Sequence, residues 1–403
     1  MNALLQGSGQ QAGHLREEHF AFADALRAVA ILLVVLTHVP LPVARDAEFQ
    51  RAFGGWGVDA FFVLSGFLLG KPYLEAILRL RPMPDAALYL RRRFLRIWPA
   101  YAVVVVASAT VEKICQCSGQ RTGLRDVAAH LAMIHNLFPA YVWGAGNAAL
   151  WTMAVDAQFY VVLPVAALVL YRVTDSDAGR TTRITVGVLL AAIALSVAWR
   201  LISPAFFPAV DIVPTIDVVQ RGLPGMFFCF ACGMLLALAR VSKFRPSAAV
   251  ARGLGLSGVA VAGILLAVPY ILADPTAAVI DVLGTISVSL IILSWPNLDA
   301  APLRRVIESE AVAIVAAHAY ALYLVHYPII GMLASILESL HVHAGTVTFT
   351  ALLALSFVPA AAIAASLLHR FVEQPFLTLK ERARETSTVQ GFGIAGARRA
   401  TSQ

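Results

Sequence analysis

Long apolar stretches recur along the whole chain, separated by short segments that hold most of the charged residues. Each stretch is close to 20 residues, the length that a helix needs to cross about 30 Å of hydrocarbon. Ten are visible, at approximately residues 22–39, 55–70, 97–111, 150–171, 184–203, 222–239, 253–272, 278–295, 312–337 and 346–369. The pattern predicts an all-α, polytopic membrane protein with about ten transmembrane helices.

Composition supports this class. Of the 403 residues, 59% are hydrophobic and only 14% are charged, which is too little charge for the surface of soluble domains. The chain is therefore expected to sit in a lipid bilayer as one membrane domain, residues 21–376. A cytoplasmic segment, residues 1–20, precedes it, and a disordered cytoplasmic tail, residues 377–403, follows it.

The net charge of +7 indicates how the chain is oriented in the membrane. When the N-terminus is placed inside, most of the Lys and Arg residues fall in the inner segments, as the positive-inside rule requires. Ten spans then return the C-terminus to the cytoplasm. The longest connections are an inner loop, residues 71–96, and an outer loop, residues 112–149, in which residues 125–141 could form a short interfacial helix. Basic charge explained in this way gives no reason to expect a nucleic-acid partner.

Ionisable side chains inside spans cost a few kcal/mol each, so each one is a hypothesis about function. The sequence places six of them there: Asp24, Arg27, His38, Asp59, Asp156 and His326. No group of His, Cys, Asp or Glu has the spacing of metal ligands, and we expect no metal site.

Two of the six share one face of the first span. Arg27 and His38 are eleven residues apart, which in an ideal helix leaves them about 20° from superposition and about 16 Å apart along the axis. Asp24 lies near the same face and can pair with Arg27. One interpretation is an ion pair at the headgroups and a helix-end histidine before Pro40. The other, favoured by the common face, is a polar cavity.

Four arginines mark the start of the third span: Arg91, Arg92, Arg93 and Arg96. Arg93 and Arg96 lie one turn apart. The cluster is consistent with positive-inside anchoring and equally with a site that binds a phosphorylated ligand from the cytoplasm.

The remaining polar groups also allow two interpretations each. Asp156 and Tyr160 share a helix face, and a buried Asp156 needs a partner, for which an Arg or His of the first span is the natural candidate. Asp59 either lines a cavity or caps its helix. For Ser65, next to Gly66, helix packing is the favoured role. His326 either packs between helices or lines a cavity, and Pro328 can leave the carbonyl of Leu324 free.

Six segments, in order, resemble the acyltransferase-3 family of bacterial membrane O-acyltransferases. They are DALRAVAILLVVLTH, GVDAFFVLSGFLL, RRFLRIWPAY, LWTMAVDAQFYVVLP, YALYLVHYPI and VEQPF. The resemblance implies that His38 is the essential histidine, that Arg27 is its partner, and that Arg93 and Arg96 serve the acyl donor. Asp156 stands where the family usually has Glu, and Ala25 where it usually has Gly. We expect no SGNH hydrolase-like domain after the membrane part, so that a relay through such a domain would need a separate protein.

The function expected from these residues is transfer of an acyl group, acetyl above others, from acetyl-CoA or another acyl-CoA to a hydroxyl of a carbohydrate or polyol-like acceptor. The reaction would serve cell-surface or exopolysaccharide O-acetylation at the bacterial inner membrane. His38 would be the general base, with Arg27 and Asp156 as catalytic partners, Arg93 and Arg96 binding the donor, and Asp24, Asp59, Tyr160 and His326 as cavity-lining candidates. No permanently bound cofactor is expected. The alternative is a transporter or flippase that uses the same charges as a substrate or proton path.

Overall fold

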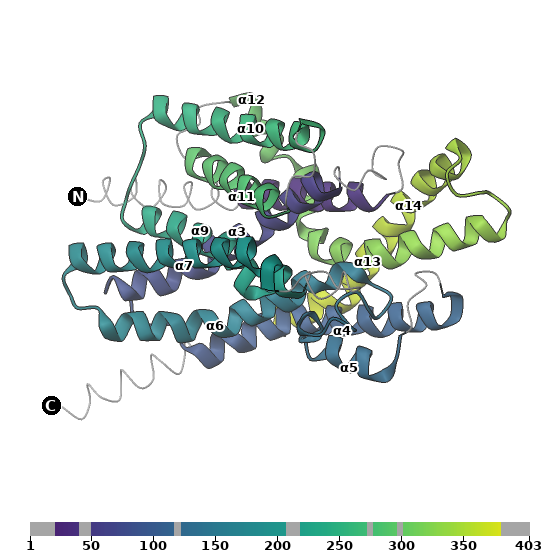
Figure 1. Cartoon of the computed structure of the whole chain (residues 1–403), viewed down its shortest axis with the longest axis horizontal. Coiled ribbons are helices and arrows are strands. Elements are labelled where there is room, and N and C mark those ends of the chain that lie inside the picture. Colours follow the sequence, from purple (N-terminus) through teal and green to yellow (C-terminus); the bar gives the residue numbers. More distant parts are fainter. Residues whose placement is uncertain are drawn as a thin grey trace, which may run out of the picture.

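The computed structural model describes residues 21–39, 50–116, 122–206, 218–271, 277–295 and 301–379. Within this part of the chain all regular elements are helices (Figure 1). They are the N-terminal helix Ala21–His38, α3 Gly55–Ile77, α4 Ala86–Cys115, α5 Leu124–Leu131, α6 Trp151–Val173, α7 Ala178–Phe206, α9 Leu223–Val241, α10 Ala248–Ile271, α11 Ala277–Ser294, α12 Ala301–Ile307, α13 Glu310–Ser339 and α14 Val347–Leu368.

The predicted all-α polytopic architecture is confirmed. Nine helices in the described residues are long and apolar enough to cross a membrane, and α11, a shorter apolar helix, occupies the place of the eighth expected span. The outward faces of the helices carry large apolar side chains, such as Leu195 of α7 and Leu256 of α10, each 72% exposed. Such faces suit contact with lipid. The N-terminal segment 1–20 and the tail from residue 380 lie outside the described residues, whereas residues 377–379, expected in the tail, are helical.

The predicted inner loop 71–96 is wrong. Helix α3 continues to Ile77 and α4 begins at Ala86, where the Asp85 carboxylate accepts a hydrogen bond of 2.7 Å from the N–H of Leu88. Hydropathy ended these spans too early because it registers only apolar residues. Lys and Arg are good helix formers and reach water from a helix end through their long stems. Lys71, Arg93 and Arg96 are therefore held on helices.

Helices α3 and α9 approach each other closely at two glycines. A Cβ built on Gly66 would lie 2.1 Å from the carbonyl oxygen of Phe230, and one built on Gly233 would lie 2.0 Å from that of Val63. Neither site tolerates a side chain, so the two glycines set the distance between the helix backbones. This is the largest helix interface in the described chain, and the packing role expected at the Ser65–Gly66 pair falls on Gly66.

Two apolar cores form along the N-terminal helix, one around its first half and one around its second half. The first joins its early residues, such as Leu26, to α3, α6, α9 and α11. The second joins its later residues, such as Val34, to α4, α13 and α14. The first helix and α3 therefore lie where the two groups meet, and this boundary holds the cavity described below.

The expected outer segment is folded. The short helix predicted within residues 125–141 is present as α5, and it buries Asp126 and His130 rather than only apolar residues. His130 and His135 are fully buried, and their rings stack with centroids 3.8 Å apart. Burial and the neighbouring His130 hold the pKa of His135 well below its ordinary value.

Candidate functional site

A cavity of about 1050 Å³ opens between the two cores. Its lining positions on α3 run from Val58 to Lys71, about 20 Å at 1.5 Å per residue. The end near Lys71 is bordered by the beginnings of the N-terminal helix, α4 and α13 and by the end of α9, and it is rich in cations. The opposite end, near Val58, is apolar. From the positive-inside rule we expect the cationic end to face the cytoplasm.

Six of the nine site residues expected from the sequence line this one cavity: Asp24, Arg27, Arg93, Arg96, Asp156 and Tyr160. The predicted pairing of Asp24 with Arg27 is present, with 2.7 Å between Oδ1 and Nη1. Both side chains are partly exposed, at 38% and 28%, which leaves the pair open to a ligand. Arg27 also lies within the electrostatic range of Arg93 and Arg96.

Asp156 lies deep in the cavity wall and is 7% exposed. Its polar neighbours are Ser65 of α3 and Tyr160, one turn further along α6, and the cation in its surroundings is Arg93 of α4. The prediction that an Arg or His of the first span is the partner of Asp156 is therefore wrong. Ser65 is a cavity residue, where packing was expected. The shared face of Asp156 and Tyr160 is confirmed.

His38 and His326 lie beyond the apolar end of the cavity, outside its lining. Their rings meet edge to face with centroids 5.0 Å apart. His38 Nδ1 is 2.7 Å from the carbonyl oxygen of Val34, and His326 Nδ1 is 2.6 Å from that of Tyr323. Because a carbonyl only accepts, each Nδ1 carries the proton and each neutral ring has an unprotonated Nε2. The two rings are therefore adjacent, with His38 partly exposed and His326 fully buried.

Pro328 acts on the backbone as the sequence predicted. It cannot donate to the carbonyl of Leu324, and that oxygen instead accepts a hydrogen bond of 2.9 Å from Nδ2 of Asn147. Asn147 and Leu324 are both buried. The outer segment is thereby tied to α13 next to His326.

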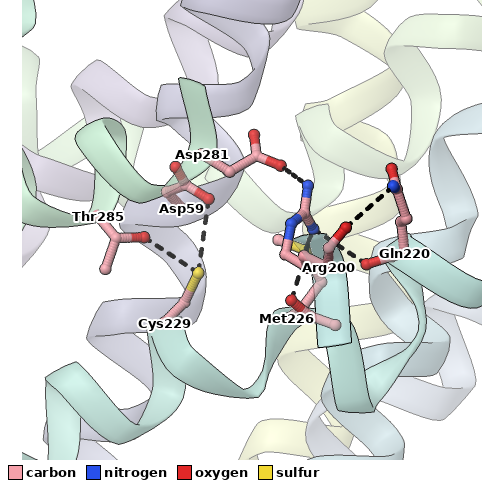
Figure 2. Close-up of polar contacts among 8 residues, drawn as sticks. Asp59, Arg200, Gln220, Met226, Cys229, Asp281 and Thr285 are labelled. Atoms are coloured by element: carbon pink, nitrogen blue, oxygen red, sulfur yellow. Dashed lines mark hydrogen bonds and ion pairs between the residues drawn. The ribbon is translucent and has the colours of Figure 1, made fainter. Parts of the chain in front are cut away.

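Asp59 was a cavity-lining candidate, but it is not among the residues of α3 that line the cavity. Those are Val58, Phe61, Phe62, Leu64, Ser65, Leu68, Leu69 and Lys71. Figure 2 shows the surroundings of Asp59. The Cys229 thiol lies 3.6 Å from Asp59 Oδ1 and 3.1 Å from Thr285 Oγ1. A polar cluster thus joins α3, α9 and α11 behind the cavity.

Arg200 and Asp281, in the same cluster, were missed as intramembrane groups. The guanidinium of Arg200 is paired with Asp281 and also donates to the carbonyl of Gln220 at 3.0 Å (Figure 2). Arg200 is only 2% exposed. The available signal was position, since both residues fall inside the expected spans 184–203 and 278–295.

Several cavity residues were also not foreseen: Lys71, Arg240, Arg245, His369 and Glu373. Glu373 belongs to the VEQPF segment, and its Oε2 lies 2.9 Å from Nδ1 of His369. The cationic residues were assigned to loops, where solvent exposure is the ordinary explanation. Among the described residues no group of three or more His, Cys, Asp or Glu side chains is placed to hold a metal ion.

The fold and the cavity define a polytopic helical membrane protein with a cationic chamber inside the membrane domain. The model of the acyltransferase-domain family known as acyltransferase 3 matches residues 20–367, and the chain belongs to this family. The resemblance seen in the six sequence segments is therefore confirmed.

Curated relatives are distant. Peptidoglycan O-acetyltransferase OatA of Listeria monocytogenes is 26% identical over 374 residues, which cover 87% of this chain and 55% of that protein. The chain thus spans about half the length of that relative. Acyltransferase MdmB of Streptomyces mycarofaciens is 24% identical over 391 residues, covering 94% of this chain and 90% of MdmB. No solved structure matches the chain.

Proposed function

We propose that the protein transfers an acetyl group from acetyl-CoA to a hydroxyl of a cell-envelope carbohydrate at the bacterial inner membrane. Membership of the acyltransferase family supports group transfer. The name of the Listeria relative supports an O-acetyl product and makes peptidoglycan the first acceptor to test.

The observation that carries the donor assignment is the charge of the cavity. Six cationic side chains line it, namely Arg27, Lys71, Arg93, Arg96, Arg240 and Arg245, against three carboxylates, namely Asp24, Asp156 and Glu373. A net cationic chamber inside a membrane domain is costly unless an anion enters it. The phosphates of coenzyme A are such anions, and arginine holds phosphate through paired, charge-assisted hydrogen bonds.

The position of the cations gives the donor an orientation. With the phosphates at the cationic end, the pantetheine arm extends along the cavity and carries the thioester toward the apolar end. Tyr323 lines that end, and on its other side its ring is 5.6 Å from the ring of His326, which contacts His38. We place the reaction at this boundary.

His38 then serves as general base. Its Nε2 takes the proton of the acceptor hydroxyl while the hydroxyl oxygen attacks the thioester carbonyl carbon. Collapse of the tetrahedral intermediate breaks the carbon–sulfur bond, and the leaving thiolate of coenzyme A takes the proton from the His38 imidazolium. Arg27 is about 16 Å from His38 along the helix, so we assign it to the donor phosphates rather than to the oxyanion. Asp156 orients Arg93.

Acetyl-CoA binding to the purified protein in detergent tests this arrangement. Arg93→Ala and Arg96→Ala each remove a charged contact of about 1.5–3 kcal/mol, which predicts a Kd raised at least about tenfold. Arg91→Ala is the matched control, because Arg91 is on the same turn of α4 as Arg93, is exposed and does not line the cavity. Equal losses in all three variants would reveal only general attraction to surface charge and would remove the support for a donor site.

A further inference from the structure

The apolar end of the cavity has a defined wall. Among the lining residues of α13, Tyr323 lies furthest from the cationic end, and Phe61 of α3 meets it with ring centroids 6.2 Å apart. Thr152 and Met153, at the beginning of α6, line the same end. These side chains come from three helices, so the wall does not depend on one loop.

Tyr323 is fixed in this wall. Its hydroxyl donates to the carbonyl of Ala149 and accepts from the hydroxyl of Thr152, and the residue is 5% exposed. The hydroxyl therefore uses its one proton and one lone pair on two partners at the start of α6. A ring whose hydroxyl is bonded in this way cannot swing aside without breaking buried hydrogen bonds.

Phe61 is the wall residue that faces the cavity. Its neighbour Phe62 also borders the cavity but packs into the first core against Trp151 and Phe230. Phe61 is only partly buried, and it lines the cavity beside Tyr323, whose ring it meets at a steep angle. The space available beyond the thioester is therefore limited by this ring.

We propose that Phe61 and Tyr323 set the length of the acyl group that the cavity accepts, restricting the donor to acetyl and similarly short acyl groups. This inference rests on the proposed function, because it takes the cationic end as the site of the coenzyme A phosphates. A donor held there projects its acyl group toward the wall, and every added methylene must displace a side chain that three helices support. One methylene in a closed pocket changes kcat/KM by about tenfold or more.

The test measures transfer of radiolabelled acetyl, butyryl and hexanoyl groups from their coenzyme A thioesters to the polysaccharide of membranes that contain the protein. The unmodified protein is expected to transfer acetyl at least about tenfold faster than butyryl and to transfer hexanoyl barely at all. Phe61→Ala opens the wall and is expected to raise the hexanoyl-to-acetyl ratio by at least about tenfold. Phe61→Leu, a milder change that protects against loss of folding, is expected to admit butyryl.

Leu68→Ala is the matched control. Leu68 lies two turns from Phe61 on the same face of α3, toward the cationic end, and it also lines the cavity. Removing its side chain enlarges the cavity without moving the wall, so the ratios should stay within about twofold of the unmodified protein. Unchanged ratios in both Phe61 variants, or an equal shift in Leu68→Ala, would overturn the inference.

The outcomes for the unmodified protein separate the two proposals. Equal transfer of all three acyl groups would refute the length restriction and leave the proposed function standing. No transfer from any of the three thioesters, with the folded protein present in the membranes, would refute the proposed function and this inference with it.

Discussion

Asn147→Ala is expected to destabilise the protein through a carbonyl on a different helix. Asn147 donates 2.9 Å to the carbonyl of Leu324, which has no intrahelical partner because residue 328 is proline. Both groups are buried. The substitution strands an acceptor where water cannot replace the lost donor.

The expected cost has two parts. A buried carbonyl without a partner costs about 1–3 kcal/mol. Asn147 Oδ1 also accepts a weaker bond of 3.3 Å from the N–H of Ala149, and loss of such a cap costs about 0.5–1 kcal/mol. Asn147→Ala should therefore lower the free energy of unfolding by about 1.5–4 kcal/mol.

Pro328→Ala separates the two parts. It supplies a backbone N–H at position 328 that can bond the carbonyl of Leu324 within α13. In this background Asn147→Ala should cost only the cap. A double-mutant cycle, measured by detergent-induced unfolding of the reconstituted protein, should therefore give a coupling of about 1–3 kcal/mol. A coupling of zero would show that Asn147 does not replace the bond that proline removes.

Three further predictions concern catalysis, packing and pH. His38→Gln should reduce acetyl transfer by about 10²–10⁴-fold. It should leave the Kd for acetyl-CoA within about twofold of the unmodified protein, since His38 lies outside the cavity. A loss of acetyl-CoA binding as large as the loss of transfer would contradict the assignment of His38 as the base. Gly233→Ala should lower the free energy of unfolding in detergent by about 1–3 kcal/mol, because the new Cβ would lie 2.0 Å from the carbonyl oxygen of Val63. Gly253→Ala is the control and should cost nothing, because a Cβ built there has no atom within 4 Å. Equal melting temperatures for the two variants would refute the close approach of α3 and α9. The pKa of His135 is depressed in the folded state, so below about pH 6.5 the unfolded chain binds more protons than the folded one. The contribution of His135 to stability is therefore full above about pH 6.5 and is lost as the pH falls below that value. Thermal unfolding followed from about pH 8 to about pH 5 should show this loss for the unmodified protein and a flatter profile for His135→Gln.

The helical architecture could be predicted because lipid imposes a length and a composition on each span. The errors concern charged residues, whose conformation the length and composition of the apolar spans do not predict. Lys71 and Arg93 were assigned to a loop because hydropathy ends at the first charged residues, although the backbone remains helical there. Arg200 lies inside an expected span, and its role depends on a partner 81 positions away, Asp281, which no local pattern could indicate.

The candidate site was predictable in part for the same reason. Arg27 and Asp156 stood out because a charge in an apolar stretch is costly, and both line the cavity. Arg240 and Arg245 did not stand out, since a cation at the end of a span is ordinary and only the packing of α9 brings these two to the cavity. Periodicity placed Arg27 and His38 on one face. It could not show that His38 lies next to His326 and outside the cavity lining, because that depends on how α13 packs.

The measurement that tests the central claim most directly uses sealed inverted membrane vesicles, with acetyl-CoA labelled in the acetyl group added on the cytoplasmic side. The account predicts that label enters vesicle polysaccharide as an alkali-labile ester, that one coenzyme A thiol is released for each ester formed, and that Arg96→Ala and His38→Gln both suppress the signal. Movement of label into the vesicles without ester formation would indicate a transporter and contradict the account.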